Sequence, residues 1–143
     1  MGFEDTFKKQ IDQIGKVLIW LMTGLLGLKE LGKINQGEDL VRQTFDSTLK
    51  IDYNRLLSID PGELVRYLQD DLKFSNDNMD RVAGIFYELA GGMEEGDKPR
   101  SKEYYERSLT LYEFLNKSDI IYSFERHYRI KDIRAALAGD DLD

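Results

Sequence analysis

The sequence predicts an all-α fold, a single helical bundle of about six helices that spans residues 1–143. Apolar residues recur at steps of three and four along most of the chain, which is typical of helices with one buried face. The only two prolines, Pro61 and Pro99, stand where helices would begin, because a first-turn proline loses no needed hydrogen bond. The length of 143 residues is that of one domain.

The first helix is predicted over residues 3–28. From Val17 to Leu28 it is apolar on all sides apart from Thr23, Gly24 and Gly27, so more than one face must be covered. Its apolar residues also alternate in steps of four and three, which makes a seam of three heptads. The seam residues are Phe7, Ile11, Ile14, Leu18, Leu21, Leu25 and Leu28.

The sequence leaves open three alternatives for what covers Val17–Leu28. This segment is the central helix of the core, a seam with a second copy or a partner, or an anchor on a membrane surface. The anchor is the least favoured, because Glu4, Asp5 and Asp12 weaken attraction to anionic lipid and the segment is too short to span a bilayer. The residues of the possible oligomer seam are Ile14, Leu18, Leu21, Leu25 and Leu28.

The remaining helices of the N-terminal half, residues 1–75, are less regular. A helix is predicted over residues 38–49, a short turn or helix over 54–58 and a further helix over 61–73. This last helix has the clearest start, since Asp60 can cap it and Glu63 stands three positions later, as in a capping box.

Residues 76–139 are predicted to form an antiparallel helical hairpin followed by a capping helix. Apolar residues at helical spacing predict the first hairpin helix over 79–93, and Gly96 is expected to end it in the left-handed conformation. The second helix is predicted over 99–117.

Large and small residues occupy particular places in this hairpin. In the first helix, two large residues, a small one and a large one follow each other at helical spacing, and the second helix has an aromatic residue between two small ones. The residues are Phe86, Leu89, Ala90 and Met93, the turn Gly96-Asp97, and then Ser101, Tyr105 and Ser108.

The stretch from Phe86 to Leu109 resembles a tetratricopeptide repeat (TPR), in which two antiparallel helices interlock through small residues. The stretches Tyr104–Leu109 and Ser123–Arg126 also look similar to uncharacterised bacterial proteins of this repeat-like type. The closing proline of the repeat is missing and no second copy occurs, so we expect one TPR-like hairpin and not a solenoid. The resemblance implies a protein–protein interaction or scaffold module without catalytic activity. The partner surface that it implies consists of Tyr87, Gly91 and Glu94 on the outward side of the first helix.

No residues form a motif for catalysis, a metal or a cofactor. The chain has no cysteine, and its single histidine, His127, lacks carboxylate or histidine neighbours at helical spacing. Carboxylate pairs and the Asn76-Asp77-Asn78 stretch lack the glycine and distant glutamate of a calcium loop. We therefore predict a non-enzyme with no cofactor and no metal.

The last helix is predicted to begin after Ser123, which can cap it, and to end before Gly139, with a frayed tail after it. It is basic within an acidic chain, which favours an alternative function, a binder of small anionic ligands or an enzyme that uses carboxylates and tyrosines in a helical pocket. The possible anion patch consists of Arg126, Arg129, Lys131 and Arg134.

The net charge of −7 argues against nucleic-acid binding, because that binding depends on Lys and Arg contacts with phosphates. The absence of cysteine and of a secretion signal favours a cytoplasmic location. A protein or peptide partner and a possible homodimer are the expected assemblies.

Overall fold

The computed structural model describes residues 3–119 and 121–142, and within these ranges the chain forms helices and no strand. The all-α prediction is confirmed. The α-helices are α1 (Phe3–Glu30), α2 (Gly37–Gln43), α3 (Tyr53–Ser58), α4 (Pro61–Arg66), α5 (Asn76–Met93), α6 (Lys98–Ser118) and α7 (Phe124–Leu142). A short 3₁₀ turn, η1 (Ile34–Gln36), precedes α2, and π-helical turns continue α2 as η2 (Thr44–Leu49) and α4 as η3 (Tyr67–Asp71).

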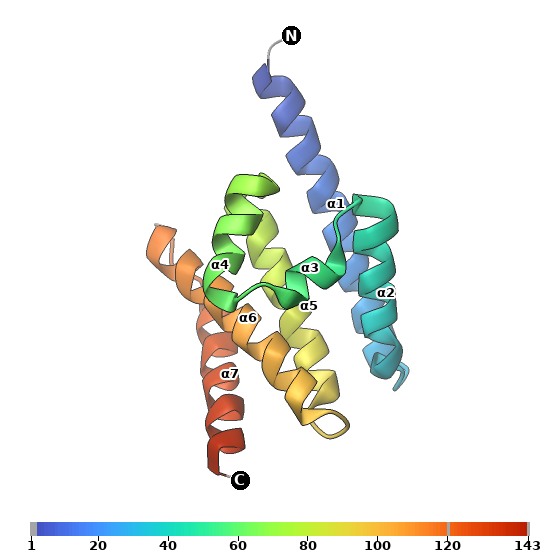
Figure 1. The fold of residues 1–143 in the computed structure, drawn as a ribbon, viewed down its shortest axis with the longest axis vertical. Coiled ribbons are helices and arrows are strands. Elements are labelled where there is room, and N and C mark those ends of the chain that lie inside the picture. Colours follow the sequence, from blue (N-terminus) through green and yellow to red (C-terminus); the bar gives the residue numbers. More distant parts are fainter. Residues whose placement is uncertain (1–2, 120, 143) are drawn as a thin grey trace.

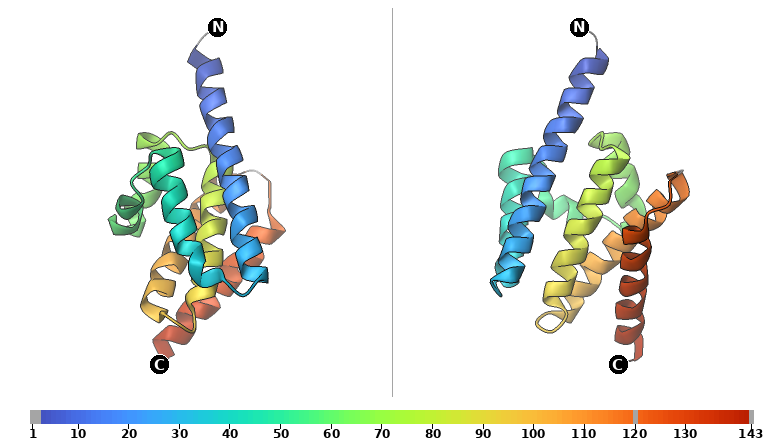
Figure 2. Two further views of the ribbon diagram at one scale, coloured as in Figure 1. Left: turned by 90° about the vertical axis from the view of Figure 1, so that its right-hand side faces the viewer. Right: turned by 180° about the vertical axis from the view of Figure 1, so that it is seen from behind.

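Helix α5 lies at the centre of the molecule and pairs with the antiparallel helix α6 (Figure 1). Seen from behind, α1, α5 and α7 run side by side in the same direction, with α2 packed against α1 (Figure 2). The short helix α4 packs on α6. The N-terminal end of α1 extends beyond the other helices (Figures 1 and 2).

Several helix starts follow directly from the sequence, because short side chains accept hydrogen bonds from unpaired backbone N–H groups. Asp60 accepts from the N–H of Gly62 at the start of α4, and Asp97 accepts from the N–H of Arg100 in α6. Ser123 accepts from the N–H of Arg126 at the start of α7, as predicted.

The structure corrects two predictions about how helices end. Helix α5 does end at Met93, but Gly96 does not take the left-handed conformation. Among the described glycines, only Gly32 has a positive φ. Helix α7 continues past Gly139 to Leu142, so residues 140–142 are not a frayed tail; Asp143 lies outside the described residues. A glycine inside an exposed helix costs only about 1 kcal/mol, so it does not force the helix to stop.

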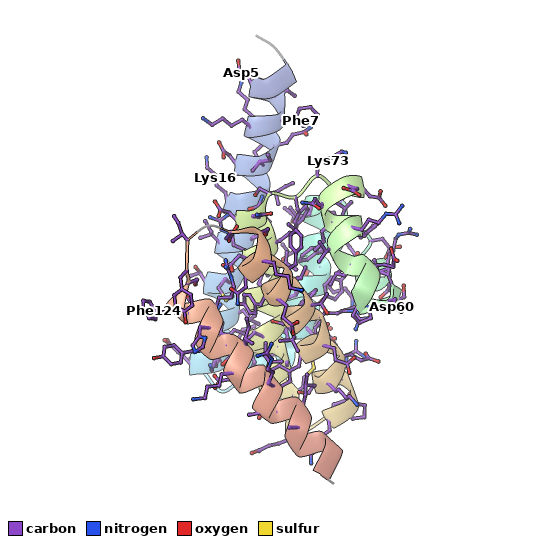
Figure 3. The ribbon with its side chains drawn as sticks, turned by 90° about the vertical axis from the view of Figure 1, so that its left-hand side faces the viewer. Asp5, Phe7, Lys16, Asp60, Lys73 and Phe124 are labelled. Carbon is purple, nitrogen blue, oxygen red and sulfur yellow. The ribbon has the colours of Figure 1, made fainter. Side chains whose placement is uncertain are left out.

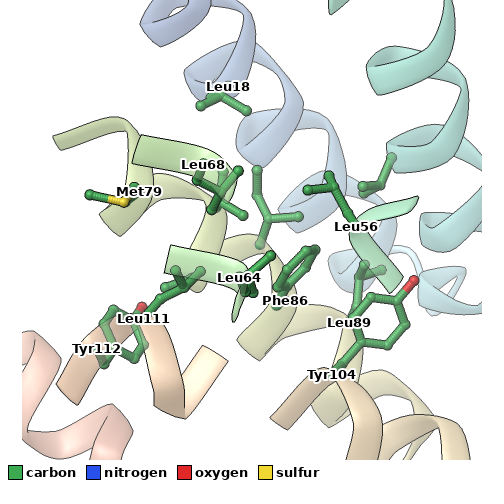
Figure 4. Close-up of a cluster of buried hydrophobic side chains, with 14 of the residues drawn as sticks. Leu18, Leu56, Leu64, Leu68, Met79, Phe86, Leu89, Tyr104, Leu111 and Tyr112 are labelled. Atoms are coloured by element: carbon green, nitrogen blue, oxygen red, sulfur yellow. The ribbon is translucent and has the colours of Figure 1, made fainter. Parts of the chain in front are cut away.

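The core is one cluster of buried side chains to which α1 to α7 all contribute. Figure 4 shows a part of it, with labelled side chains from α1, α3, α4, α5 and α6. Its largest fully buried members come from five helices and both π-helical turns. They are Tyr53, Tyr104, Tyr112, Phe45, Phe86, Leu18, Leu21, Leu25, Leu56, Leu64, Leu68 and Met79.

The hairpin of α5 and α6 is held together by two buried serines. Ser101 Oγ donates to the carbonyl of Ala90 at 2.8 Å, and Ser108 Oγ donates to the carbonyl of Ala83 at 2.7 Å. Small residues on both helices let the backbones approach closely enough for these bonds. The sequence predicted Ala90, Ser101 and Ser108 as interlocking positions, and the structure places all three at the contact.

A buried polar network joins α2, α3 and α6. The hydroxyls of Tyr53 and Tyr104 lie 2.8 Å apart, and Tyr104 also donates to Glu38 Oε2 at 2.6 Å. Arg100 Nε pairs with the same carboxylate oxygen at 2.6 Å. Arg107 of α6 is 5% exposed and donates to the carbonyls of residues 56, 57 and 59 at the end of α3. These bonds fix the otherwise short helix α3 on the bundle.

Candidate interaction groove

A hollow of about 310 Å³ lies on the back of the molecule, where α1, α5 and α7 run side by side. All three helices line it. The residues are Leu18, Ile19, Met22, Thr23 and Leu26 from α1, Asp80, Arg81 and Gly84 from α5, and Glu125 and Arg129 from α7.

The α1 wall of this groove is apolar and partly open to solvent. Ile19 is 51% exposed and Leu26 is 40% exposed, although both belong to a helix whose other side is fully buried. They stand with Met22 at steps of three and four, so the three side chains share one side of α1. This wall is a surface on which a partner could bury apolar side chains.

The floor and the opposite wall carry charged side chains, most of which pair within the chain, while Arg81 donates to the side-chain amide oxygen of Asn78 at 2.8 Å. Arg129 Nη2 lies 2.6 Å from Glu125 Oε1, and Arg126 Nη2 lies 3.2 Å from Asp80 Oδ1. The floor is narrow at Gly84, where a methyl group would lie 2.9 Å from Arg129 Nη1. Glycine at this position lets the guanidinium of Arg129 cross from α7 to α5.

The three predicted partner residues share one side of α5 with Gly84, at steps of three and four. Tyr87 is half-buried, and its hydroxyl donates to Asp132 Oδ2 of α7 at 2.8 Å. The guanidinium of Arg129 lies over its ring, 5.2 Å from the centroid. Gly91 and Glu94 are exposed further along the same side. The structure thus brings the three residues onto the surface that adjoins α7.

Burial raises the pKa of Tyr87 to about 12, and its hydrogen bond to Asp132 acts in the same direction. The phenol therefore remains protonated at neutral pH and acts as a donor. The ring of Tyr87 is held in place by Arg129 and Asp132 of α7, one helical turn from Gly84 in the groove.

A second hollow of about 330 Å³ continues this surface at the hairpin turn. Tyr105 on its wall donates to Glu94, and Glu95 and Lys98 lie beside them. The opposite side is formed by small residues near the end of α7, including Ala135 and Gly139.

The four residues of the predicted anion patch do not share one surface. Arg126 is 7% exposed and pairs with Asp80 and Asp119, and Arg129 donates to the hydroxyl of Tyr112 at 2.8 Å. Lys131 and Arg134 are exposed on a different side of α7. The first two guanidinium groups thus bind groups of their own chain.

His127 is exposed near the start of α7 and lies among aromatic rings. Its ring centroid is 5.9 Å from that of Tyr122 and 5.6 Å from that of Tyr128. Among the described residues, no group of three or more His, Asp or Glu side chains is placed to hold a metal ion.

The predicted oligomer seam lies inside the molecule. Leu18, Leu21 and Leu25 are fully buried, while Ile14 and Leu28 are partly buried. This side of α1 belongs to the core, but the central helix of the bundle is α5 and not α1. The other side of α1 remains open and forms a wall of the groove, which the sequence did not reveal, although the apolar character of the whole segment indicated that a second side needs cover.

Within the described part of the chain, one helix, over Asp5–Glu30, is long and apolar enough to cross a membrane. Length and composition alone give this result, and the core helix of a soluble protein passes the same test. In this structure the side of the helix that carries Leu18, Leu21 and Leu25 is packed against protein.

The chain is thus an all-α helical bundle with a groove lined by α1, α5 and α7. Searches of protein-family models, curated proteins and solved structures found no match.

Proposed function

We propose that this chain is a non-catalytic protein–protein interaction or scaffold module that binds a peptide or helix of a partner in the groove between α1, α5 and α7. The observation that carries this proposal is the half-exposed apolar wall of Ile19 and Leu26 beside a hollow lined by three helices. An apolar helix face that lies in such a groove is a common mode of peptide recognition.

The arrangement of the helices supports the same proposal. Helices α1, α5 and α7 line one face, while α2 and α6 pair with α1 and α5 behind it. If the hairpin is TPR-like, one helix of each antiparallel pair faces the partner. Tyr87 and Gly91, which this hypothesis assigns to the partner surface, lie on the groove side of α5.

The test is a pull-down from the cells of origin with a chain that carries Ile19→Glu and Leu26→Glu. Both side chains are exposed, so the fold should be kept, and circular dichroism checks this. We expect partners to be lost, because a carboxylate cannot be buried against an apolar face without a large cost. Tyr87→Ala should weaken the same partners.

Leu31→Glu is the matched control, since Leu31 is 71% exposed beyond the end of α1 and outside the groove. It should retain every partner. If the Ile19→Glu, Leu26→Glu chain and Tyr87→Ala also retain every partner, the groove is not the binding surface.

A further inference from the structure

Arg81 of α5 lines the groove at the end nearest the N-terminus of α1, where its guanidinium lies against Gly15. Its Nη1 donates to the side-chain oxygen of Asn78 at 2.8 Å, which is an uncharged acceptor. Among the described residues, no carboxylate lies within ion-pair distance of Arg81. The groove therefore contains a guanidinium that its own chain does not pair with an acidic group.

The position of this guanidinium is fixed by a buried amide. Asn78 is fully buried, and its Nδ2 donates to the carbonyl of Ile11 in α1 at 3.0 Å while its Oδ1 accepts from Arg81. A methyl group at Gly15 would lie 3.3 Å from Arg81 Nη1, so glycine leaves the space that the guanidinium occupies against α1. Arg81 is partly exposed and an arginine has several N–H donors, so donors remain for a group outside the chain.

The two carboxylates that line the groove bond to α7 and not to Arg81. Glu125 Oε1 lies 2.6 Å from Arg129 Nη2, and Asp80 Oδ1 lies 3.2 Å from Arg126 Nη2. Both acidic groups thus have a guanidinium of α7 as their partner. An acidic group that binds Arg81 must come from another molecule.

The guanidinium stands at one end of the apolar wall of the groove. Gly15, Ile19, Met22 and Leu26 follow each other at steps of four, three and four, so they share one side of α1. From Gly15 to Leu26 this side extends over about 16 Å of helix at 1.5 Å per residue. Along the groove, a positive charge is therefore followed by apolar side chains over about two helical turns.

On the basis of the function proposed above, we propose that the segment bound in the groove is an amphipathic helix with a carboxylate at one end of its apolar face. This carboxylate binds the guanidinium of Arg81, while the apolar face packs on Ile19 and Leu26. A guanidinium can hold a carboxylate through two parallel N–H···O bonds, which are stronger than bonds between neutral groups. A basic residue at the same place is repelled, so Arg81 makes the groove selective among apolar helices.

A display selection tests this chemistry without a known partner. The probe is a library of helical peptides with leucine along one face and random residues at both ends of that face. Clones that bind the unmodified chain but not the Ile19→Glu, Leu26→Glu chain occupy the groove. We expect these clones to carry Asp or Glu at one end of the leucine face, and selection on Arg81→Glu to give Lys or Arg there.

Fluorescence anisotropy of one selected peptide measures the contact directly. Replacement of its carboxylate by the amide should weaken binding to the unmodified chain at least about fivefold and have little effect on Arg81→Gln. Arg81→Lys keeps the charge and should retain part of this difference. Circular dichroism checks that each variant is folded.

Lys16→Gln is the matched control for the loss of a positive charge. Lys16 directly follows Gly15, but it is exposed, points away from the bundle (Figure 3) and lines a different hollow. This variant should bind the peptide like the unmodified chain and keep the preference for the carboxylate.

The outcomes separate this inference from the function on which it rests. Clones that occupy the groove without a preference for Asp or Glu, or with a preference that Arg81→Glu leaves unchanged, would overturn the role of Arg81 and leave the groove as the binding surface. If no enriched clone depends on Ile19 and Leu26, the proposed function fails, and the role of Arg81 fails with it.

Discussion

At the residue scale, two lysines hold the left-handed backbone conformation that favours glycine. Lys50 has φ 58° and Lys73 has φ 60°, and each follows a π-helical turn. After each of them the next N–H reaches back to the helix, from Ile51 to the carbonyl of Phe45 and from Phe74 to that of residue 68, both at 2.9 Å. The same helix-ending turn thus occurs after η2 and after η3. In both cases the apolar side chain that follows the lysine, Ile51 or Phe74, is buried.

Lys73→Gly should stabilise the fold by about 1 kcal/mol. The left-handed conformation costs a non-glycine residue about 1–2 kcal/mol, part of which is offset by the greater freedom of glycine in the unfolded chain. Urea denaturation measures the change. Lys102→Gly, within the exposed side of α6, is the control and should destabilise by about 1 kcal/mol. A loss of stability with Lys73→Gly would contradict this explanation.

At the element scale, the two adjacent glycines of α5 have opposite surroundings. A methyl group at Gly92 would lie 2.5 Å from Ile34 Cγ1 of η1, whereas one at Gly91 would meet nothing closer than the hydroxyl of Tyr105 at 3.8 Å. Gly92 therefore allows η1 to pack against α5. Of the two adjacent glycines, Gly92 is the one at a close approach of another element.

Gly91→Ala should stabilise the protein by up to about 1 kcal/mol, because alanine is the better helix former and space is open. Gly92→Ala should destabilise it by about 1–2 kcal/mol, since the branched side chain of Ile34 must move and overpacking costs more than the helix gains. Thermal or urea unfolding of the two variants measures the difference. Equal effects would show that η1 is not packed as described.

At the scale of the whole molecule, buried tyrosine hydroxyls make stability depend on alkaline pH. Burial raises the pKa of Tyr53, Tyr104 and Tyr112 well above the usual value near 10. For Tyr104, the charge of Tyr53 and the hydrogen bond to Glu38 raise the pKa further. The native protein keeps these protons at a pH where the unfolded chain has lost them.

The free energy of unfolding should therefore be independent of these groups below about pH 10 and fall above it. Each buried tyrosine contributes a slope of about 1.4 kcal/mol per pH unit once the unfolded chain ionises. Urea denaturation at a series of alkaline pH values measures the slope, which Tyr104→Phe should reduce. Tyr128→Phe, at an exposed position, should leave it unchanged. If Tyr104→Phe leaves the slope unchanged, groups other than Tyr104 cause the loss of stability at alkaline pH.

Part of the candidate groove could be predicted from the sequence alone. The spacing of Tyr87, Gly91 and Glu94 along the sequence places them on one side of a helix, because helical periodicity is a local property. It did not reveal that Ile19 and Leu26 would line the same surface, since the whole segment around them is apolar. Which side of such a helix is covered depends on the neighbours that pack against it.

The sequence by itself determined that the chain is helical and where most helices begin. These features depend on side chains and backbone groups a few residues apart, such as Ser123 with the N–H of Arg126. The tertiary structure decided which sides of α1 are buried, where the groove lies and that the N-terminal end of α1 projects from the bundle. Such features depend on contacts between distant residues, such as the pair of Lys29 and Glu88 at 3.0 Å, which periodicity does not specify.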